Sequence, residues 1–361
     1  MSDTSTKRML NAYLEQSAQK PGFFTQFFQS PERNFFTQET VEIDIRRSGN
    51  QIAPVLTTLG ADLHRTENRK FVNKEFKPAV YGEEFGLGVK DAMKRQLGQD
   101  PFQDLGYLRA LQTAFTAEMT ERETMIRGGI ELQASQVLRT GTLSLPGVTG
   151  ATAFTLDYQP KSTHFPGAET DWDESNVTTR VKDVRSLCNV IWEDGNYRPK
   201  YLVFGEKALI SWLADTEVKE QIRKDGTGVG EQVPPQLREG GVFHGRVSVG
   251  QFQLEMWSAP GIYSAISNGA STKYLGDWEV MVVSEGARLD LVFGDIPILA
   301  ADPRVSALSL GRVSSSGGRI DLITNAWVTP NGRNIFGSVE ARPLCIPTAI
   351  DTFGTLNAKV S

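Results

Sequence analysis

The longest periodic pattern in the chain runs from about Leu105 to Leu138. Apolar residues recur there at steps of three, four or their sums, at Leu108, Leu111, Phe115, Met119, Ile126, Ile130 and Val137. This spacing is typical of an amphipathic helix, and Asp100-Pro101 and Asp104 supply start signals. At about 1.5 Å per residue the helix would be on the order of 50 Å long, which is far above the average for globular proteins.

Two adjacent glycines, Gly128 and Gly129, interrupt this helical pattern. Each glycine costs up to about 1 kcal/mol relative to alanine in a helix interior. Close packing against another backbone is one explanation, and a place where the helix bends is the other. Both explanations stay open, and in the second one Gly128 and Gly129 form a hinge in the helix.

Strict alternation predicts strands near both ends of the chain. TVEIDIRR (Thr40 to Arg47) alternates cleanly, and the apolar positions from Val72 to Val80 fit its return strand. Such a hairpin, polar on both faces, has little apolar surface to bury by itself. RIDLITNAWV and NIFGSVEARPLCI alternate again on either side of the turn Pro330-Asn331-Gly332.

The middle of the chain predicts a mixed α/β core. One helical face comprises Val177, Val181, Val184, Leu187 and Ile191. KYLVFG (Lys200 to Gly205) then has the pattern of a buried strand, KALISWLAD that of a helix, and strand candidates follow at 246–249, 252–257, 278–283 and 288–293.

The N-terminal segment is polar apart from FFTQFF (Phe23 to Phe28). Phenylalanines on an arm that has no core of its own are expected to dock on a neighbouring surface.

Charge adds one unexpected feature. The chain has 38 Lys and Arg against 43 Asp and Glu, yet LHRTENRKFVNKEFKP (Leu63 to Pro78) is strongly basic. Its cations are Arg65, Arg69, Lys70, Lys74 and Lys77. A nucleic-acid patch, a solvated loop, or a surface for an acidic part of another copy would each explain it. The overall acidity argues against a dedicated DNA or RNA binder.

Localisation follows from what the sequence lacks. No apolar run approaches the roughly 18 residues of a membrane span, and the first residues have no signal-peptide core. Cys188 and Cys345 stand far apart, so we expect no disulfide framework and a protein kept in a reducing cytoplasm.

A search for catalytic chemistry finds no constellation that a structural role does not explain better. The histidines, at 64, 164 and 244, have no metal-binding spacing and are expected to be isolated surface residues. There is no nucleophile elbow, and GTGVGE (Gly226 to Glu231) lacks the context of a phosphate loop. The cluster ETDWDES resembles a magnesium site, but Asp173 or Ser175 capping the next helix explains it better. We therefore predict no enzymatic activity, no metal and no cofactor.

Several segments, in order along roughly 330 residues, resemble the major capsid proteins of tailed bacteriophages, specifically the family of the phage lambda major head protein. They are FFTQFF with NFFTQETVEID, FVNKEFKPAVY, the long helical pattern, FTLDYQPK with DWDES, and finally NAWVT (Asn325 to Thr329) with ARPL (Ala341 to Leu344). Arg342 interrupts the Ala-Pro-Leu run of the family, and the loop tip is more basic than the family pattern.

The resemblance implies the Hong Kong 97-type α+β capsid fold. The implied parts are an N-terminal arm (1–38), an extended loop with its base (39–90), a peripheral domain with the spine helix (91–176), an axial domain (177–318) and a tail returning to the peripheral domain (319–361). It also implies hexamers and pentamers in an icosahedral shell around double-stranded DNA, assembled in the host cytoplasm. The implied partners are a portal, a possible decoration protein and a separate scaffolding protein, since about forty residues before the loop are too few for a fused scaffold.

On this interpretation the basic stretch lies across a neighbouring subunit. The candidate acidic partners, chosen from charge alone, are Glu118, Glu121 and Glu123 on the spine helix, or Glu83 and Glu84 at the loop base. Two rival interpretations stay open at this point: a nucleic-acid-binding protein that uses residues 63–78, and an α/β enzyme of unknown class.

Overall fold

The computed structural model describes most of the 361-residue chain. The described residues are 22–29, 35–36, 40–45, 72–76, 78–88, 107–147, 151–174, 177–225, 236–238, 240–264, 269, 271–294, 296, 305–306, 322–329 and 333–359.

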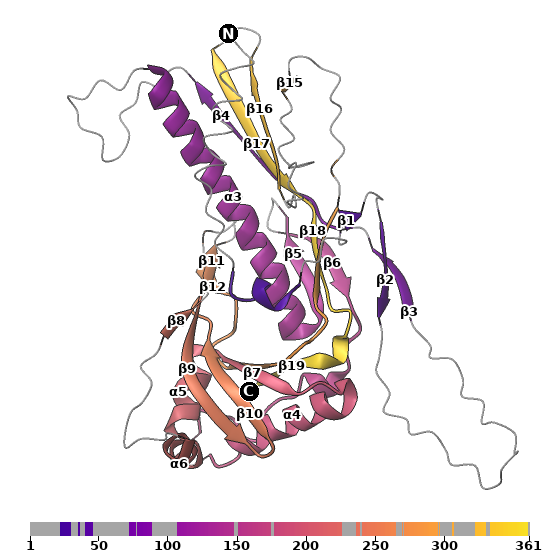
Figure 1. The fold of residues 1–361 in the computed structure, drawn as a ribbon, viewed down its shortest axis with the longest axis vertical. Coiled ribbons are helices and arrows are strands. Elements are labelled where there is room, and N and C mark those ends of the chain that lie inside the picture. Colours follow the sequence, from indigo (N-terminus) through magenta and orange to yellow (C-terminus); the bar gives the residue numbers. More distant parts are fainter. Residues whose placement is uncertain are drawn as a thin grey trace, which may run out of the picture.

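One long helix, α3 (Tyr107–Thr140), runs through the upper part of the molecule (Figure 1). It confirms the helix predicted from periodicity, displaced by two residues. A four-stranded antiparallel sheet in the order β15-β16-β17-β4 lies beside it. Its strands are β4 (Tyr81–Gly88), β15 (Val305–Ser306), β16 (Ile323–Val328) and β17 (Asn334–Ala341). Phe85 on β4 packs against Phe115 on α3, with ring centroids 5.3 Å apart, so the helix covers one face of this sheet.

A six-stranded sheet in the order β19-β13-β7-β10-β9-β8 forms the lower part (Figure 1). All neighbours are antiparallel except β7 and β10. Its strands are β7 (Pro199–Phe204), β8 (Gln236–Arg238), β9 (Gly241–Val249), β10 (Phe252–Ser258), β13 (Glu279–Ser284) and β19 (Phe353–Asn357). The helices of this part are α4 (Arg180–Gly195), α5 (Glu206–Ala214) and α6 (Thr216–Asp225). The predicted face of α4, including Val184 and Leu187, is buried in one cluster with Leu202 of β7.

The remaining strands form small sheets. They are β1 (Phe35–Phe36), β14 (Asp290–Gly294) and β18 (Pro343–Ile346) in one sheet, then the pairs β2 (Val41–Ile45) with β3 (Val72–Phe76), β5 (Thr142–Pro146) with β6 (Thr152–Asp157), and β11 (Ile262–Ser264) with β12 (Ser271–Lys273). Three 3₁₀ turns complete the described elements: η1 (Thr25–Phe27), η2 (Ser162–His164) and η3 (Ile350–Thr352). The antiparallel pairing of β2 with β3 confirms the predicted return strand.

The C-terminal tail (319–361) contributes strands to three different sheets. β16 and β17 lie beside β4, but β18 pairs with β14 and β19 pairs with β13 in the six-stranded sheet. The strand β19 gave no sequence signal because it is short and buried on both faces, with Phe353 to Leu356 all buried. Gly354 lies against the His164 carbonyl, where a Cβ would come within 2.5 Å of the oxygen.

The start of α4 also differs from the sequence prediction. The helix begins at Arg180, and its N-cap residue Thr179 makes no side-chain capping bond. The Arg180 guanidinium donates to the carbonyls of Val177 (2.7 Å) and Trp172 (3.1 Å), so the preceding chain is held by this side chain. Asp173 pairs with Lys359 instead of capping α4, and Ser175 lies outside the described residues.

Phe23 to Phe28 dock on the chain's own core, where Phe23, Phe24 and Phe28 are buried. The surface on which these rings were predicted to dock is therefore part of the same subunit. Among the described residues, no helix has both the length and the apolar composition needed to cross a membrane.

Candidate assembly elements

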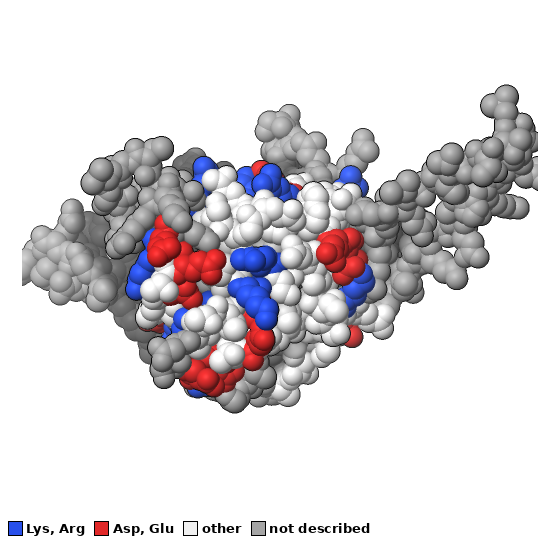
Figure 2. All heavy atoms as spheres, turned by 90° about the horizontal axis from the view of Figure 1, so that it is seen from below, with Lys and Arg blue, Asp and Glu red and all other residues white. Residues whose placement is uncertain are grey.

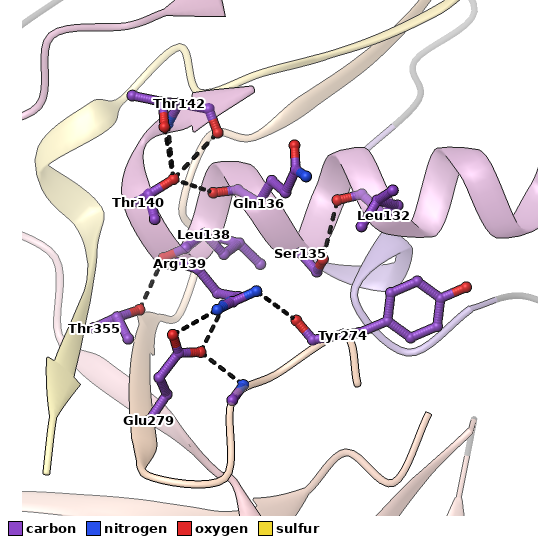
Figure 3. Close-up of polar contacts among 11 residues, drawn as sticks. Leu132, Ser135, Gln136, Leu138, Arg139, Thr140, Thr142, Tyr274, Glu279 and Thr355 are labelled. Atoms are coloured by element: carbon purple, nitrogen blue, oxygen red, sulfur yellow. Dashed lines mark hydrogen bonds and ion pairs between the residues drawn. The ribbon is translucent and has the colours of Figure 1, made fainter. Parts of the chain in front are cut away.

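The last turn of α3 is joined to the six-stranded sheet by one arginine (Figure 3). The Arg139 guanidinium donates two parallel hydrogen bonds to the Glu279 carboxylate, both 2.6 Å, and a third to the Tyr274 carbonyl at 3.2 Å. Glu279 also accepts the backbone N–H of Gly276 at 2.8 Å. Bidentate pairs of this kind are shorter and stronger than neutral hydrogen bonds. The side chains are mostly shielded from water, so this pair fixes the orientation of the helix relative to β13.

Neighbouring contacts support the same joint. Thr355 on β19 donates its hydroxyl to the Leu138 carbonyl at 2.9 Å, which satisfies one of the free carbonyls at the helix end. Gly141 follows with a positive φ of 65° and donates its N–H to the Val137 carbonyl. The helix therefore ends in a glycine cap that is fastened to both neighbouring layers.

The proposed hinge, Gly128 and Gly129, lies where two tyrosines touch the helix backbone. The Tyr274 hydroxyl donates to the Gly128 carbonyl and the Tyr81 hydroxyl to the Gly129 carbonyl, each at 3.3 Å. A Cβ at position 129 would lie 2.7 Å from the Tyr81 ring, whereas one at position 128 would meet only the Tyr274 hydroxyl, at 3.5 Å. α3 is continuous through both residues. This contact favours the packing explanation at Gly129, and the hinge stays a prediction.

The acidic residues proposed as partners of the basic loop occupy different environments. Glu118 and Glu121 both pair with Arg122, at 2.7 and 3.1 Å, and the Glu121 side chain is 66% exposed. Glu123 is buried and pairs with Arg127 at 2.8 Å. A buried acid that already has a partner is a poor candidate for contact with another subunit. Glu84 on β4 is exposed and Glu83 is half-buried.

Most of the basic stretch lies outside the described residues. Arg65, Arg69, Lys70 and Lys77 are not described, and Lys74 lies in β3, where only the backbone is described. The proposed contact between this stretch and another subunit is therefore still a prediction.

The histidine prediction is wrong for His164. This side chain is only 1% exposed, and its Nδ1 and Nε2 lie 2.9 Å from the Phe353 carbonyl and 3.1 Å from the Asp194 carboxylate. It thus holds η2 against β19 and α4. His244 on β9 is half-buried beside Ser258, and burial lowers its pKa. No signal in the sequence around either residue distinguishes these buried settings from a loop.

Other candidate chemistry also has structural partners. Glu169 of the acidic cluster pairs with Lys182 at 2.6 Å. No group of three or more potential metal ligands occurs in the part of the chain that the structure describes. Cys188 and Cys345 are buried and free, and burial raises the pKa of Cys188 to about 12. A thiol of that kind stays protonated and unreactive at neutral pH.

In the view from below, the described residues form no broad basic face. Figure 2 shows their Lys and Arg in small groups beside groups of Asp and Glu, with neutral surface between them. Phosphate binding depends on cations gathered over a whole face, and the described residues of this face do not have that arrangement.

Comparison with known proteins identifies the family. A family model described as phage major capsid protein E matches residues 6–357. The chain belongs to the phage major capsid protein E family. This capsid protein forms the shell of a phage particle, as the sequence resemblance to phage capsid proteins predicted.

Solved structures show the fold of this capsid protein. It is similar to the capsid protein of a prophage of E. coli CFT073, with a TM-score of 0.65, 16% identity and 99% of both chains covered. It is also similar to a phage-related protein from Bordetella bronchiseptica RB50, with a TM-score of 0.51 and 10% identity over 97% of this chain and 96% of that one. The predicted Hong Kong 97-type α+β fold is confirmed. No curated protein sequence matches the chain.

Proposed function

We propose that this capsid protein assembles as hexamers and pentamers into an icosahedral shell that encloses double-stranded phage DNA. The observation that carries the proposal is the ribbon formed by β2 and β3. In the described part of the chain these strands pair only with each other, and they stand apart from the body of the molecule (Figure 1). A two-stranded ribbon is marginally stable in water. Contact with a second copy would supply the surface that this ribbon lacks.

We further propose roles for the parts of the subunit. Residues 1–38 would act as the arm and 39–90 as the extended loop with its base. The long helix with the strands β4, β16 and β17 would form the periphery of each capsomer, and residues 177–318 would surround its axis. The tail (319–361) would connect the peripheral part to the axial part more tightly than the sequence suggested, because it supplies β19 as an edge strand of the six-stranded sheet.

The cations of the loop would face acidic residues of a neighbouring copy. Glu84 and Glu121 fit this role better than Glu123, because both are exposed and Glu123 is buried against Arg127. The alternative partners Glu83 and Glu118 are partly shielded. Each such contact is weak in water, but it repeats at every equivalent position of a closed shell.

The protein would work with other components of a phage head. We propose a scaffolding protein and a portal protein as partners, with a decoration protein as an optional third, and assembly in the host cytoplasm. We also propose that it has no enzymatic activity and binds DNA without sequence specificity. Its membership of a structural family supports this.

Negative-stain electron microscopy and size-exclusion chromatography of the purified protein test the proposal. Rings of five or six subunits, or closed shells, would support it. A stable monomer or dimer that forms no larger particle with a scaffolding protein present would contradict it. A steep salt-dependent affinity for short duplex DNA in that small species would favour the nucleic-acid-binding alternative.

A further inference from the structure

The segment that precedes β1 crosses three separate parts of the subunit. We call residues 22–29 the strap. At one end it contacts α3, in its middle its rings lie against β7 and β10, and at its other end Gln29 pairs with β14. The Gln29 N–H donates to the Leu289 carbonyl at 2.7 Å, and the Leu291 N–H donates to the Gln29 carbonyl at 2.8 Å. In Figure 1 the strap is the indigo coil beside the lower half of α3.

One buried carboxylate holds the strap to α3. Glu131 accepts the backbone N–H of Phe24 at 2.6 Å, and the backbone N–H and the hydroxyl of Thr25 at 2.9 and 2.5 Å. Gly22 makes the approach possible, because a Cβ there would lie 2.0 Å from the carboxylate oxygen. If the carboxylate were absent, the buried N–H of Phe24 and the partly buried N–H of Thr25 would lose their acceptor, and the strap would have to turn towards water to satisfy them.

Packing beside this carboxylate is incomplete. A pocket of about 260 Å³ lies between the strap and α3, lined among others by Phe23, Phe24, Arg127, Gly128 and Tyr274. This pocket is partly open to solvent, so water can reach the seam between the strap and α3. The hydrogen bonds to Glu131 fasten the strap across this seam.

The strap covers an aromatic surface. Phe27 packs on Tyr201 with ring centroids 5.3 Å apart, Phe23 on Trp257 at 5.9 Å, and Phe24 on Tyr274 at 6.4 Å. Lifting the strap would expose both sets of rings together. Exposed apolar patches promote association between proteins.

We propose that residues 22–29 form a separately opening strap that Glu131 locks onto α3, and that the locked strap keeps an aromatic trough closed in the unassembled subunit. The trough is floored by Tyr201, Trp257 and Tyr274. The shell is built from many copies of this chain, so the lock would prevent premature association through these rings. This inference rests on the contacts within one subunit and does not depend on the hexamer and pentamer arrangement.

Hydrogen exchange followed by mass spectrometry tests the lock on the full-length chain, with unassembled subunits separated by size-exclusion chromatography. Glu131→Gln keeps the shape but removes the charge, and Glu193→Gln at an exposed position of α4 is the matched control. We expect peptides within residues 22–29 to exchange at least tenfold faster in E131Q than in the wild type or E193Q. Peptides from residues 132–140 and from the six-stranded sheet should exchange at the wild-type rate.

Two results would overturn the proposal. Unchanged exchange in the strap of E131Q would show that the aromatic contacts hold it alone. Equal acceleration in the strap, α3 and the sheet would show that Glu131 supports the whole fold instead of locking one segment. If E131Q does not fold, Thr25→Val tests the lock instead. This variant removes the hydroxyl that donates to Glu131 and retains the side-chain shape. Faster exchange confined to the strap of T25V supports the lock, and wild-type exchange there rejects it.

Discussion

Tyr81 on β4 lies against Gly129 on α3 so closely that a Cβ at position 129 would be 2.7 Å from the ring. The Tyr81 hydroxyl donates to the Gly129 carbonyl and accepts a hydrogen bond from Gln133 at 2.9 Å. Burial raises the pKa of Tyr81 to about 12, so the hydroxyl keeps its proton under ordinary conditions. A glycine at this position thus lets a sheet residue reach the helix backbone.

The two glycines should respond differently to alanine. Gly129→Ala forces the Tyr81 ring to move, and we expect a loss of about 1–3 kcal/mol in unfolding free energy, as for other overpacked sites. Gly128→Ala adds a methyl in ordinary contact with Tyr274 and should gain up to about 1 kcal/mol. Urea unfolding of unassembled subunits measures both. A G129A variant as stable as the wild type would contradict the packing explanation.

The hinge hypothesis is then best tested at Gly128 alone. If α3 bends there during shell maturation, the stiffer helix of G128A should slow assembly of the immature shell or cause early expansion. Time-resolved light scattering and electron microscopy follow these steps. Normal rates of assembly and expansion would leave packing as the only role of the glycines. Ala114→Ser is the control for a small substitution elsewhere in the same helix.

The bidentate pair between Arg139 and Glu279 should contribute measurably to stability. Arg139→Ala leaves a partly buried carboxylate without its main partner, and we expect a loss of about 1–3 kcal/mol. Arg139→Lys keeps the charge but not the two-bond geometry, so it should recover only part of the loss. Lys182→Ala breaks an exposed pair with Glu169 and serves as the control, with little expected change. Denaturation midpoints that are equal for R139A and K182A would contradict this assignment.

His244 should make stability depend on pH. Burial lowers its pKa from the ordinary value of 6.5, so below about pH 6.5 the unfolded chain binds a proton there that the folded chain does not. The stability that the neutral, buried ring contributes is therefore present above that pH and lost as the pH falls. We expect the difference in unfolding free energy between the wild type and His244→Gln to shrink from pH 7.5 to 5.5. A difference that is constant across this range would show that folding does not lower the pKa of this ring.

The basic loop should matter for the shell and not for the subunit. Reversing Arg69 and Lys70 to glutamate should leave thermal unfolding of unassembled subunits nearly unchanged, since exposed charges contribute about 0–1 kcal/mol each. Shell yield should collapse, because the same unfavourable contact repeats in every copy. The charge-conserving double variant R69K/K70R is the control and should assemble. If the reversed variant forms shells at normal yield, the loop does not pair with acidic residues of a neighbour.

Local patterns in the sequence determined several elements of this protein. The steps of three and four from Leu108 to Val137 predicted α3, and the alternation around Thr40 and Val72 predicted the β2–β3 ribbon. These predictions succeed because each depends on which residues face one side of a single helix or strand, and that is set by spacing along the chain. The order of such segments also carried the family resemblance.

Only the tertiary structure decided the contacts that join these elements. Glu131 meets Phe24 across 107 residues, and Thr355 meets Leu138 across 217. No local feature of the sequence marks His164 as buried. The residues of β19 show no alternation of apolar and polar positions that would predict a strand. Glu131 is not among the apolar positions that predicted α3, yet the strap covers it. Burial and hydrogen bonding at such distances depend on where the whole chain places each group, so no window of neighbouring residues contains the information.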